Sequence, residues 1–200
     1  MKKTLLAARL ALILACAWSL QTASADVITL WDFESTTSND PVIGSGTQGL
    51  LPDAIDNSSL AVVYFRIGSS TTAGSGLEWE VSTAGYENVT LSIDMRRPDG
   101  SANARNWTWQ YDLGSGWVDA SNFSLANQIW NNFTLDLSAI SGASNNPNFK
   151  FGVATTNSPN FSVTVDFDNI TVSGTPVPEP GAFVLMAVGL GGIAVWRRRK

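Results

Sequence analysis

The chain contains no histidine and only one cysteine. Across its 200 residues the histidine count is zero, and Cys16 carries the single thiol. The absence of imidazole excludes Ser-His-Asp triads, His-ligated zinc and helix-borne His pairs. Cys16 lies in an N-terminal segment that we expect to be removed, so we expect no disulfide, thiolate nucleophile or Cys-based metal site in the mature protein. Carboxylate pairs remain, so glycosidase chemistry stays open.

Basic residues are scarce between the two ends of the chain. Residues 26–175 hold five basic and sixteen acidic residues, a formal charge of −11, and the other seven basic residues lie in the terminal segments. A domain this acidic does not bind nucleic acid by neutralising phosphates, but it is soluble and attracts cations. Its length of about 150 residues is that of one ordinary domain.

The N-terminus has the three regions of a secretory signal peptide. Two lysines follow Met1, and an apolar run from residue 5 to residue 20 is interrupted only by Arg9 and Ser19. Residues 23–25, Ala-Ser-Ala, then supply the small side chains that signal peptidase requires. The pattern predicts a signal peptide at residues 1–25 that is cleaved after Ala25. An uncleaved anchor is the alternative, but so short and interrupted a run fits a bilayer core of about 30 Å poorly.

The last residues form a second membrane-directed segment. Three prolines make residues 175–180 rigid and extended, and residues 181–196 are apolar and uncharged. A helix over residues 181–196 would be about 24 Å long, a marginal span for a core of about 30 Å. Four basic residues end the chain and place that end in the cytoplasm: Arg197, Arg198, Arg199 and Lys200. The preceding domain therefore faces outward.

This order of parts resembles the PEP-CTERM sorting signal of Gram-negative bacterial proteins. The short span, the Arg-rich end and a Pro-Glu-Pro box all match over residues 176–200, and the box is Val177, Pro178, Glu179 and Pro180. The resemblance implies recognition by exosortase, a membrane-embedded peptidase, and removal of the tail near the box. It also implies a transient membrane-anchored intermediate, delivery to the cell surface or matrix, and a host that makes exopolysaccharide or biofilm. An ordinary anchor that stays in place is the alternative.

The region between these ends has the composition of an all-β domain. It is rich in Thr, Val, Phe, Trp, Ser, Asn and Gly and lacks long helical patterns. Alternation and turn signals predict strands at residues 27–35, 60–67, 77–82, 90–96, 106–113, 128–137, 149–155 and 162–173. The long segment at residues 36–59 is expected to be irregular, with room for one extra strand. This spacing predicts a two-sheet antiparallel sandwich of jelly-roll type over residues 26–175.

The tryptophans offer two interpretations. Trp107, Trp109, Tyr111 and Leu113 share one face of a predicted strand, while polar residues occupy the other. An exposed aromatic stripe would be a platform for sugar rings, but the strictly polar opposite face favours a core position. Trp117 follows a Gly-Ser-Gly turn near a loop edge and is the candidate for sugar binding.

The last strand carries acids on a face that we expect to be buried. Asp166 and Asp168 have the same parity as Ile170 and Val172, which are expected to point inward. A buried carboxylate without a partner costs several kcal/mol. No Lys or Arg lies in this strand, so a cation or a set of backbone N–H groups is the expected partner.

A second resemblance covers about a dozen residues. Leu30-Trp31-Asp32-Phe33-Glu34 near the start and Phe167 to Val172 near the end are similar to segments of carbohydrate-binding-module-type jelly rolls. The resemblance implies a structural calcium held through oxygen ligands by one acid from each terminal strand, which are Glu34 and Asp168 here. The alternative is that these acids cap loops or face solvent.

These observations support three functions. The first is an exported, non-enzymatic surface or extracellular-matrix protein that is sorted by exosortase. The second is a protein with a carbohydrate-binding module that recognises a polysaccharide. The third is a jelly-roll glycosidase or lyase, for which Glu78 and Glu80 form the nearest acid pair, although two acids so spaced on a strand are more often solvated surface.

Overall fold

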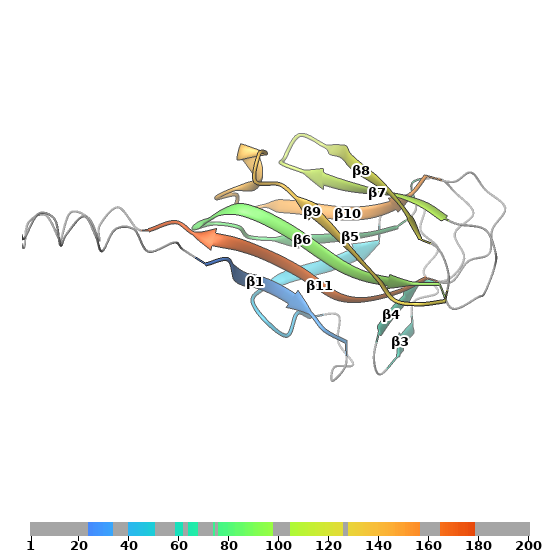
Figure 1. The fold of residues 1–200 in the computed structure, drawn as a ribbon. Helices are drawn as coiled ribbons and strands as arrows, with labels where there is room; N and C mark the ends of the chain where they lie inside the picture. The colour runs from blue at the N-terminus through green and yellow to red at the C-terminus, as the bar shows by residue number, and fades with distance from the viewer. Residues whose placement is uncertain are drawn as a thin grey trace, which may run out of the picture.

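Two antiparallel β-sheets stack face to face and enclose the core (Figure 1). The computed structural model describes residues 24–33, 40–50, 59–61, 64–67, 74, 76–97, 105–125, 128–156 and 165–178. Most of the predicted signal peptide and the whole predicted transmembrane helix lie outside the described residues. Within the described ranges, no helix has the length and apolar character that a membrane crossing requires.

The six-stranded sheet is built around the last strand of the chain. That strand pairs with β6 on one side and with both β1 and β4 on the other, and β3 and β9 lie at the edges. The strands are β1 (Asp26–Trp31), β3 (Ser59–Ala61), β4 (Tyr64–Ile67), β6 (Tyr86–Arg96), β9 (Asn131–Asp136) and β11 (Val165–Pro176). The sheet can therefore be completed only after the chain has reached Pro176.

The second sheet has five strands, in the order β2-β5-β10-β7-β8. They are β2 (Gly46–Leu50), β5 (Gly76–Val81), β7 (Arg105–Asp112), β8 (Trp117–Leu125) and β10 (Phe149–Thr155), and a 3-10 turn at Ser141–Ala143 precedes β10. From β4 onward the chain pairs like a long folded hairpin: β4 with β11, β5 with β10, β6 with β9, and β7 with β8. This is jelly-roll pairing, so the predicted all-β two-sheet sandwich is confirmed.

Alternation along the strands places the core between the sheets. In β6, Val89, Leu91, Ile93 and Met95 are fully buried, while the residues between them face outward. Each such side chain contributes about 1.5–3 kcal/mol through burial. From the other sheet, Trp79 packs on Phe151 with ring centroids 5.2 Å apart.

The tryptophan stripe of β7 belongs to this core. Trp107 and Trp109 are 3% and 1% exposed, and Tyr111 and Leu113 pack against the same cluster. The core interpretation of this stripe is therefore confirmed, and the platform interpretation of these four residues is wrong.

One whole strand escaped the sequence patterns. β8 was not among the predicted strands, because as an edge strand it is exposed along most of its length. Of its apolar residues, Phe123 packs against the core and Leu125 is buried, whereas Val118 is 44% exposed. A register shift opposite Trp109 and Gln110 further breaks its alternation. The extra strand allowed for within residues 36–59 is β2.

The prediction that Asp166 and Asp168 share the inward face with Ile170 and Val172 is wrong. The β11–β6 register shifts between Asp168 and Thr171, and Asn169 adopts a left-handed φ of 49°. Such a bulge moves the following side chains to the opposite face. Before the bulge the core residues are Val165 and Phe167; after it they are Ile170 and Val172.

Asp166 consequently lies on the outer face of its sheet, where it has a partner in the neighbouring strand. The Nη2 of Arg96 donates to its Oδ2 at 2.8 Å and the Nε at 3.1 Å. The same guanidinium lies 4.6 Å from the ring centroid of Trp130. The carboxylate is fully buried, and a guanidinium of the neighbouring strand is a partner that the sequence analysis did not consider.

Candidate functional site

The first and last strands meet at one end of the sandwich, on the left in Figure 1. In the β1–β11 pairing Asp26 lies opposite Gly174, and β11 ends two residues later at Pro176. We name this the exit end, and it consists of residues 26–27, 82–87, 136–146 and 174–178. The predicted signal-peptidase cut and the start of the tail therefore lie side by side.

The sorting box begins while the chain is still part of the sheet. Pro176 is the last paired residue of β11, opposite Tyr86. The backbone N–H of Val177 then donates to the carbonyl of Gly85 at 2.8 Å. Val177 is 41% exposed, and Pro178 is exposed too. Glu179, Pro180 and the four basic residues from Arg197 to Lys200 lie outside the described residues.

A hydrogen-bonded frame holds the turn that receives Val177. The Gly85 N–H donates to Oδ1 of Asn145 at 3.0 Å, and the Asn145 N–H donates to the Tyr86 carbonyl at 2.8 Å. Beneath them the fully buried Thr83 donates its hydroxyl to the Ala143 carbonyl at 2.7 Å. The box therefore leaves from a fixed position on the folded domain.

Close packing of Gly174 fixes the end of β11 as well. A Cβ at this position would lie 3.0 Å from Cδ1 of Ile28 in β1 and 3.1 Å from Cβ of Tyr86 in β6. Any larger residue would push these neighbours aside, so the glycine favours the close approach of the two flanking strands to β11.

Asp168 lies near the end of the β1–β11 pairing that is opposite the exit end, beside the residues that follow β1, as the calcium prediction requires. It is 8% exposed, and its Oδ1 accepts the N–H of Asn169 at 2.8 Å. Desolvation raises the pKa of Asp168, and the negative charges of Asp32 and Asp94 raise it further, while hydrogen bonds from the N–H groups of Asn169 and Phe33 oppose the rise. Backbone N–H groups, the second of the two predicted partners, are therefore present.

The described residues around Asp168 do not form a metal centre on their own. Asp94, its neighbour across the β6–β11 pairing, accepts Nδ2 of Asn132 at 2.7 Å on one oxygen and Nδ2 of Asn169 at 3.0 Å on the other. In the described part of the chain, no group of three or more acidic, His or Cys side chains is placed to hold a metal. Glu34 lies outside the described residues, so the calcium at Glu34 and Asp168 stays a prediction.

Trp117 lies on the outer face of the five-stranded sheet. It begins β8, and the Cζ3 atom of its indole lies 3.5 Å from where a Cβ of Gly152 would stand. Gly152 occupies an outward position between the core residues Phe151 and Val153 of β10. The missing side chain lets the indole approach the sheet, and Trp117 stays partly exposed. Sequence reasoning missed Gly152, although a glycine inside a strand is a signal of such close approach.

Charged residues lie in the same cross-strand row as Trp117: Asp112, Lys150 and Glu80. Nζ of Lys150 lies 3.0 Å from Oε2 of Glu80, and this hydrogen bond and charge raise the pKa of Lys150. In the turn before Trp117, Oδ1 of Asp112 accepts the N–H groups of Gly114 at 2.7 Å and Gly116 at 2.9 Å. Desolvation acts to raise the pKa of Asp112, but these backbone hydrogen bonds outweigh it and lower the pKa.

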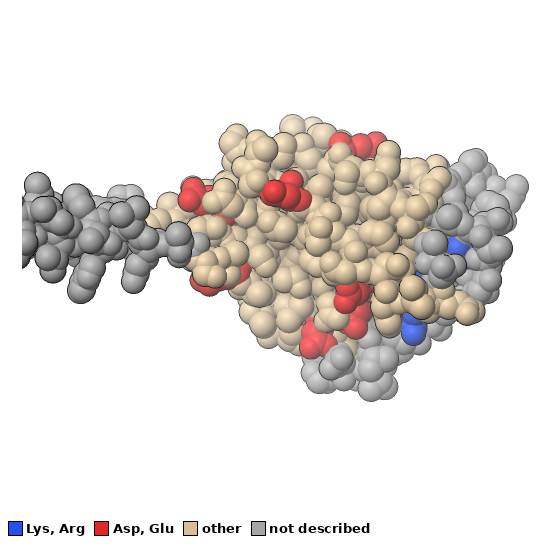
Figure 2. All heavy atoms as spheres, viewed as in Figure 1, with Lys and Arg blue, Asp and Glu red and all other residues tan. Residues whose placement is uncertain are grey.

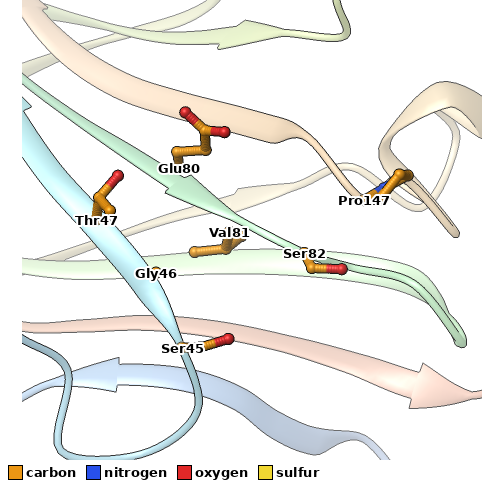
Figure 3. A pocket seen from close by; sticks show the side chains of 7 residues that line it. All are labelled: Ser45, Gly46, Thr47, Glu80, Val81, Ser82 and Pro147. Carbon is orange, nitrogen blue, oxygen red and sulfur yellow. The ribbon is translucent and has the colours of Figure 1, made fainter.

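A shallow hollow lies near the exit end, between β2 and β5 (Figure 3). Its volume is about 290 Å³, at the lower limit for small-molecule sites. Its lining residues are mostly small or polar: Ser45, Gly46, Thr47, Glu80, Val81, Ser82 and Pro147. None of them is aromatic, and Glu80 is already paired with Lys150, so we do not assign a ligand to it.

A family model described as the PEP-CTERM protein-sorting motif matches residues 176–200. The predicted resemblance of the tail is therefore confirmed. The match begins at the residue with which β11 ends. No curated protein matches the chain.

Solved structures with the same fold include carbohydrate-binding modules. The CBM22-1 xylan-binding domain of Paenibacillus barcinonensis Xyn10C is 12% identical, with a TM-score of 0.53 over 78% of this chain and 99% of that one. The CBM22-1 and GH10 modules of Clostridium thermocellum Xyn10B are 10% identical, with a TM-score of 0.52 over 74% of this chain and 28% of that one.

An exo-beta-agarase is 11% identical, with a TM-score of 0.52 over 74% of this chain and 25% of that one. At such identities these matches establish the fold alone. The chain thus carries a PEP-CTERM sorting motif directly behind a β-sandwich of the fold found in carbohydrate-binding modules.

Proposed function

We propose that this chain is an exported, non-enzymatic protein of the cell surface or extracellular matrix, which exosortase sorts and cleaves through residues 177–180. The observation that carries the proposal is the position of the motif, which begins where β11 ends. A cut beyond Val177 removes the tail and leaves every strand of the sandwich complete. The released domain would thus be completely folded, acidic and soluble, which suits it to an exopolysaccharide or biofilm layer.

The predicted N-terminal cut would also leave the strands of the sandwich complete. Cleavage after Ala25 would start the mature protein at Asp26, the first residue of β1. A membrane-anchored intermediate, followed by release to the surface or matrix, accounts for both cuts.

Tail removal in the native host tests the sorting proposal. We expect the intact mass of the surface protein to lack residues 181–200, and we expect the full tail to persist when exosortase is deleted. Replacing Pro178 and Pro180 with Ala should block removal. Pro147→Ala is the matched control, because it changes a loop proline outside the motif. A tail that is retained in the wild-type protein would refute the proposal.

Polysaccharide binding is the second candidate function, and Trp117 is the observation that favours it. Its indole lies over Gly152 on an open sheet face with charged and polar neighbours. An accessible aromatic ring beside hydrogen-bonding groups is the arrangement that sugar rings recognise. The xylan-binding domain with the same fold makes xylan a suitable first probe.

A pull-down of the mature protein on insoluble xylan and on the host's matrix polysaccharide tests this function. We expect Trp117→Ala to weaken the affinity about fivefold or more, since loss of one stacking ring costs more than about 1 kcal/mol. Trp130→Ala is the control, because Trp130 is also partly exposed, at 38%, but lies beside Arg96 and away from this face. Equal binding by both variants would exclude Trp117 as the contact.

The glycosidase or lyase alternative has less support. Glu78 and Glu80 lie on the outward side of β5, opposite Gly152 and Lys150 of β10. Glu80 forms an ion pair with Lys150 and is 44% exposed, which is typical of a solvated surface pair. Lack of turnover of matrix glycans by the purified protein is the expected result.

A structural calcium at Glu34 and Asp168 belongs to the proposal as well. The negative charges of Asp32 and Asp94 around Asp168 would be relieved by a bound cation. Calcium should then raise the melting temperature of the mature protein, and Asp168→Asn should remove the calcium dependence. A melting curve that neither calcium nor a chelator shifts would eliminate this site.

A further inference from the structure

The sorting segment is tied to the folded domain by a very short tether. Val177 is still hydrogen-bonded to Gly85, and only residues 178–180 separate it from the expected membrane span at residue 181. Three extended residues reach at most about 10 Å. While the tail is embedded, the exit end must therefore lie within about 10 Å of the surface at which exosortase acts.

The N-terminal strand brings the predicted signal-peptidase cut to the same end of the domain as the sorting box. Asp26, the residue after the predicted signal-peptidase cut, lies opposite Gly174 in the β1–β11 pairing. Both processing steps are carried out at a membrane, and both act on this end. The frame of Thr83, Gly85 and Asn145 keeps it folded, so the domain cannot swing away from the box.

The exit end is acidic. Asp26, Glu87 and Asp136 are exposed there, and Figure 2 shows acidic side chains and no basic ones at the left end of this face. Among the basic residues of the described ranges, Arg96 and Arg97 lie at the opposite end of β6, and Lys150 is paired with Glu80. The other two also lie away from the exit end: Arg66 lies opposite Asp166 near the start of β11, and Arg105 lies opposite Leu125 at the end of β8. A negative surface held about one Debye length from a bilayer is repelled by anionic headgroups and attracted by a basic protein surface.

We propose that the exit end is a docking surface for the sorting peptidase, and that it contacts a basic patch on the outward side of that enzyme. The proposal rests on the exosortase sorting proposed above. The short tether makes the contact unavoidable, and the charge of the exit end makes a basic partner favourable. The folded domain, in addition to residues 177–180, then takes part in substrate recognition.

Charge reversal tests the docking surface in the full-length chain, co-expressed with its exosortase. Glu87→Lys changes an exposed side chain at the exit end, and Glu78→Lys makes the same change on the outward side of β5. Pulse-chase measurement of tail removal should show a rate about three- to tenfold lower for Glu87→Lys. The Glu78→Lys rate should equal that of the wild type, and circular dichroism should show that both variants are folded at the temperature of the assay.

A flexible spacer tests whether proximity is the cause. Twelve Gly and Ser residues inserted between Val177 and Pro178 remove the enforced contact, so the Glu87→Lys defect should disappear in that background. A Glu87→Lys rate equal to or above the wild-type rate, or a defect that survives the spacer, would overturn the docking surface. An increased rate would indicate a lipid surface instead. These results would overturn the docking surface but leave the proposed sorting by exosortase intact. Failure of the wild type to lose its tail would refute the sorting function itself.

Discussion

The exit end and the outer face of the five-stranded sheet are the two candidate functional regions, and they are built in different ways. At the exit end the important contacts are made by backbone groups: the β1–β11 pairing, the Val177–Gly85 hydrogen bond and the close approach at Gly174. On the sheet face a few side chains carry the candidate activity, above all Trp117. Delivery therefore depends on a complete fold, whereas binding can be gained or lost by single substitutions.

Removal of a core side chain should have the largest effect and should damage both regions. Phe151 is fully buried beneath the sheet face and packs on Trp79. Phe151→Ala should lower the free energy of unfolding by about 3–5 kcal/mol, measured by urea denaturation of the mature protein. Val118→Ala, at a position 44% exposed, should change it by less than about 0.5 kcal/mol. Equal effects would show that the sheets do not pack as described.

A larger side chain at Gly174 should damage the exit end alone. Gly174→Val forces atoms between Ile28 and Tyr86 and should cost about 1–3 kcal/mol in the same assay. Ser173→Val, at the neighbouring outward position, is the control and should be nearly neutral. Polysaccharide binding through Trp117 should persist in folded Gly174→Val protein. A neutral Gly174→Val would contradict the close approach of β1 and β6 to β11.

The smallest effect is expected at Asp112, which fixes the turn before Trp117. Its pKa is lowered from the usual 3.8 in the folded protein, so its stabilising contribution is present at neutral pH and is lost as the pH falls through the folded-state value. Asp112→Asn should lower the free energy of unfolding by about 1 kcal/mol or less at pH 7. Urea denaturation of both proteins from pH 7 to pH 2 should show this difference shrinking, and a constant difference would contradict the role of the charge.

The features that could be predicted from the sequence are encoded by neighbouring residues in the chain. The β7 stripe of Trp107 and Trp109 alternates strictly and was correctly assigned to the core. The tail motif is contiguous, so residues 176–200 could be recognised without a fold.

The features that sequence patterns did not predict depend on contacts between residues far apart in the chain. The bulge at Asn169 reversed the expected direction of Asp166, and its partner Arg96 lies 70 residues earlier. The contact of Trp117 with Gly152 likewise arises only after β7 and β10 have paired. No local pattern specifies which strands become neighbours, so such sites appear only in the folded structure.

The C-terminal residue of the mature protein tests the central claim most directly. Intact-mass and C-terminal peptide analysis of the protein recovered from the cell surface or matrix would identify it. We predict a terminus between Val177 and Pro180, which leaves β11 and its pairing with β1 complete. A retained tail, or a cut inside β11 before Pro176, would contradict the account.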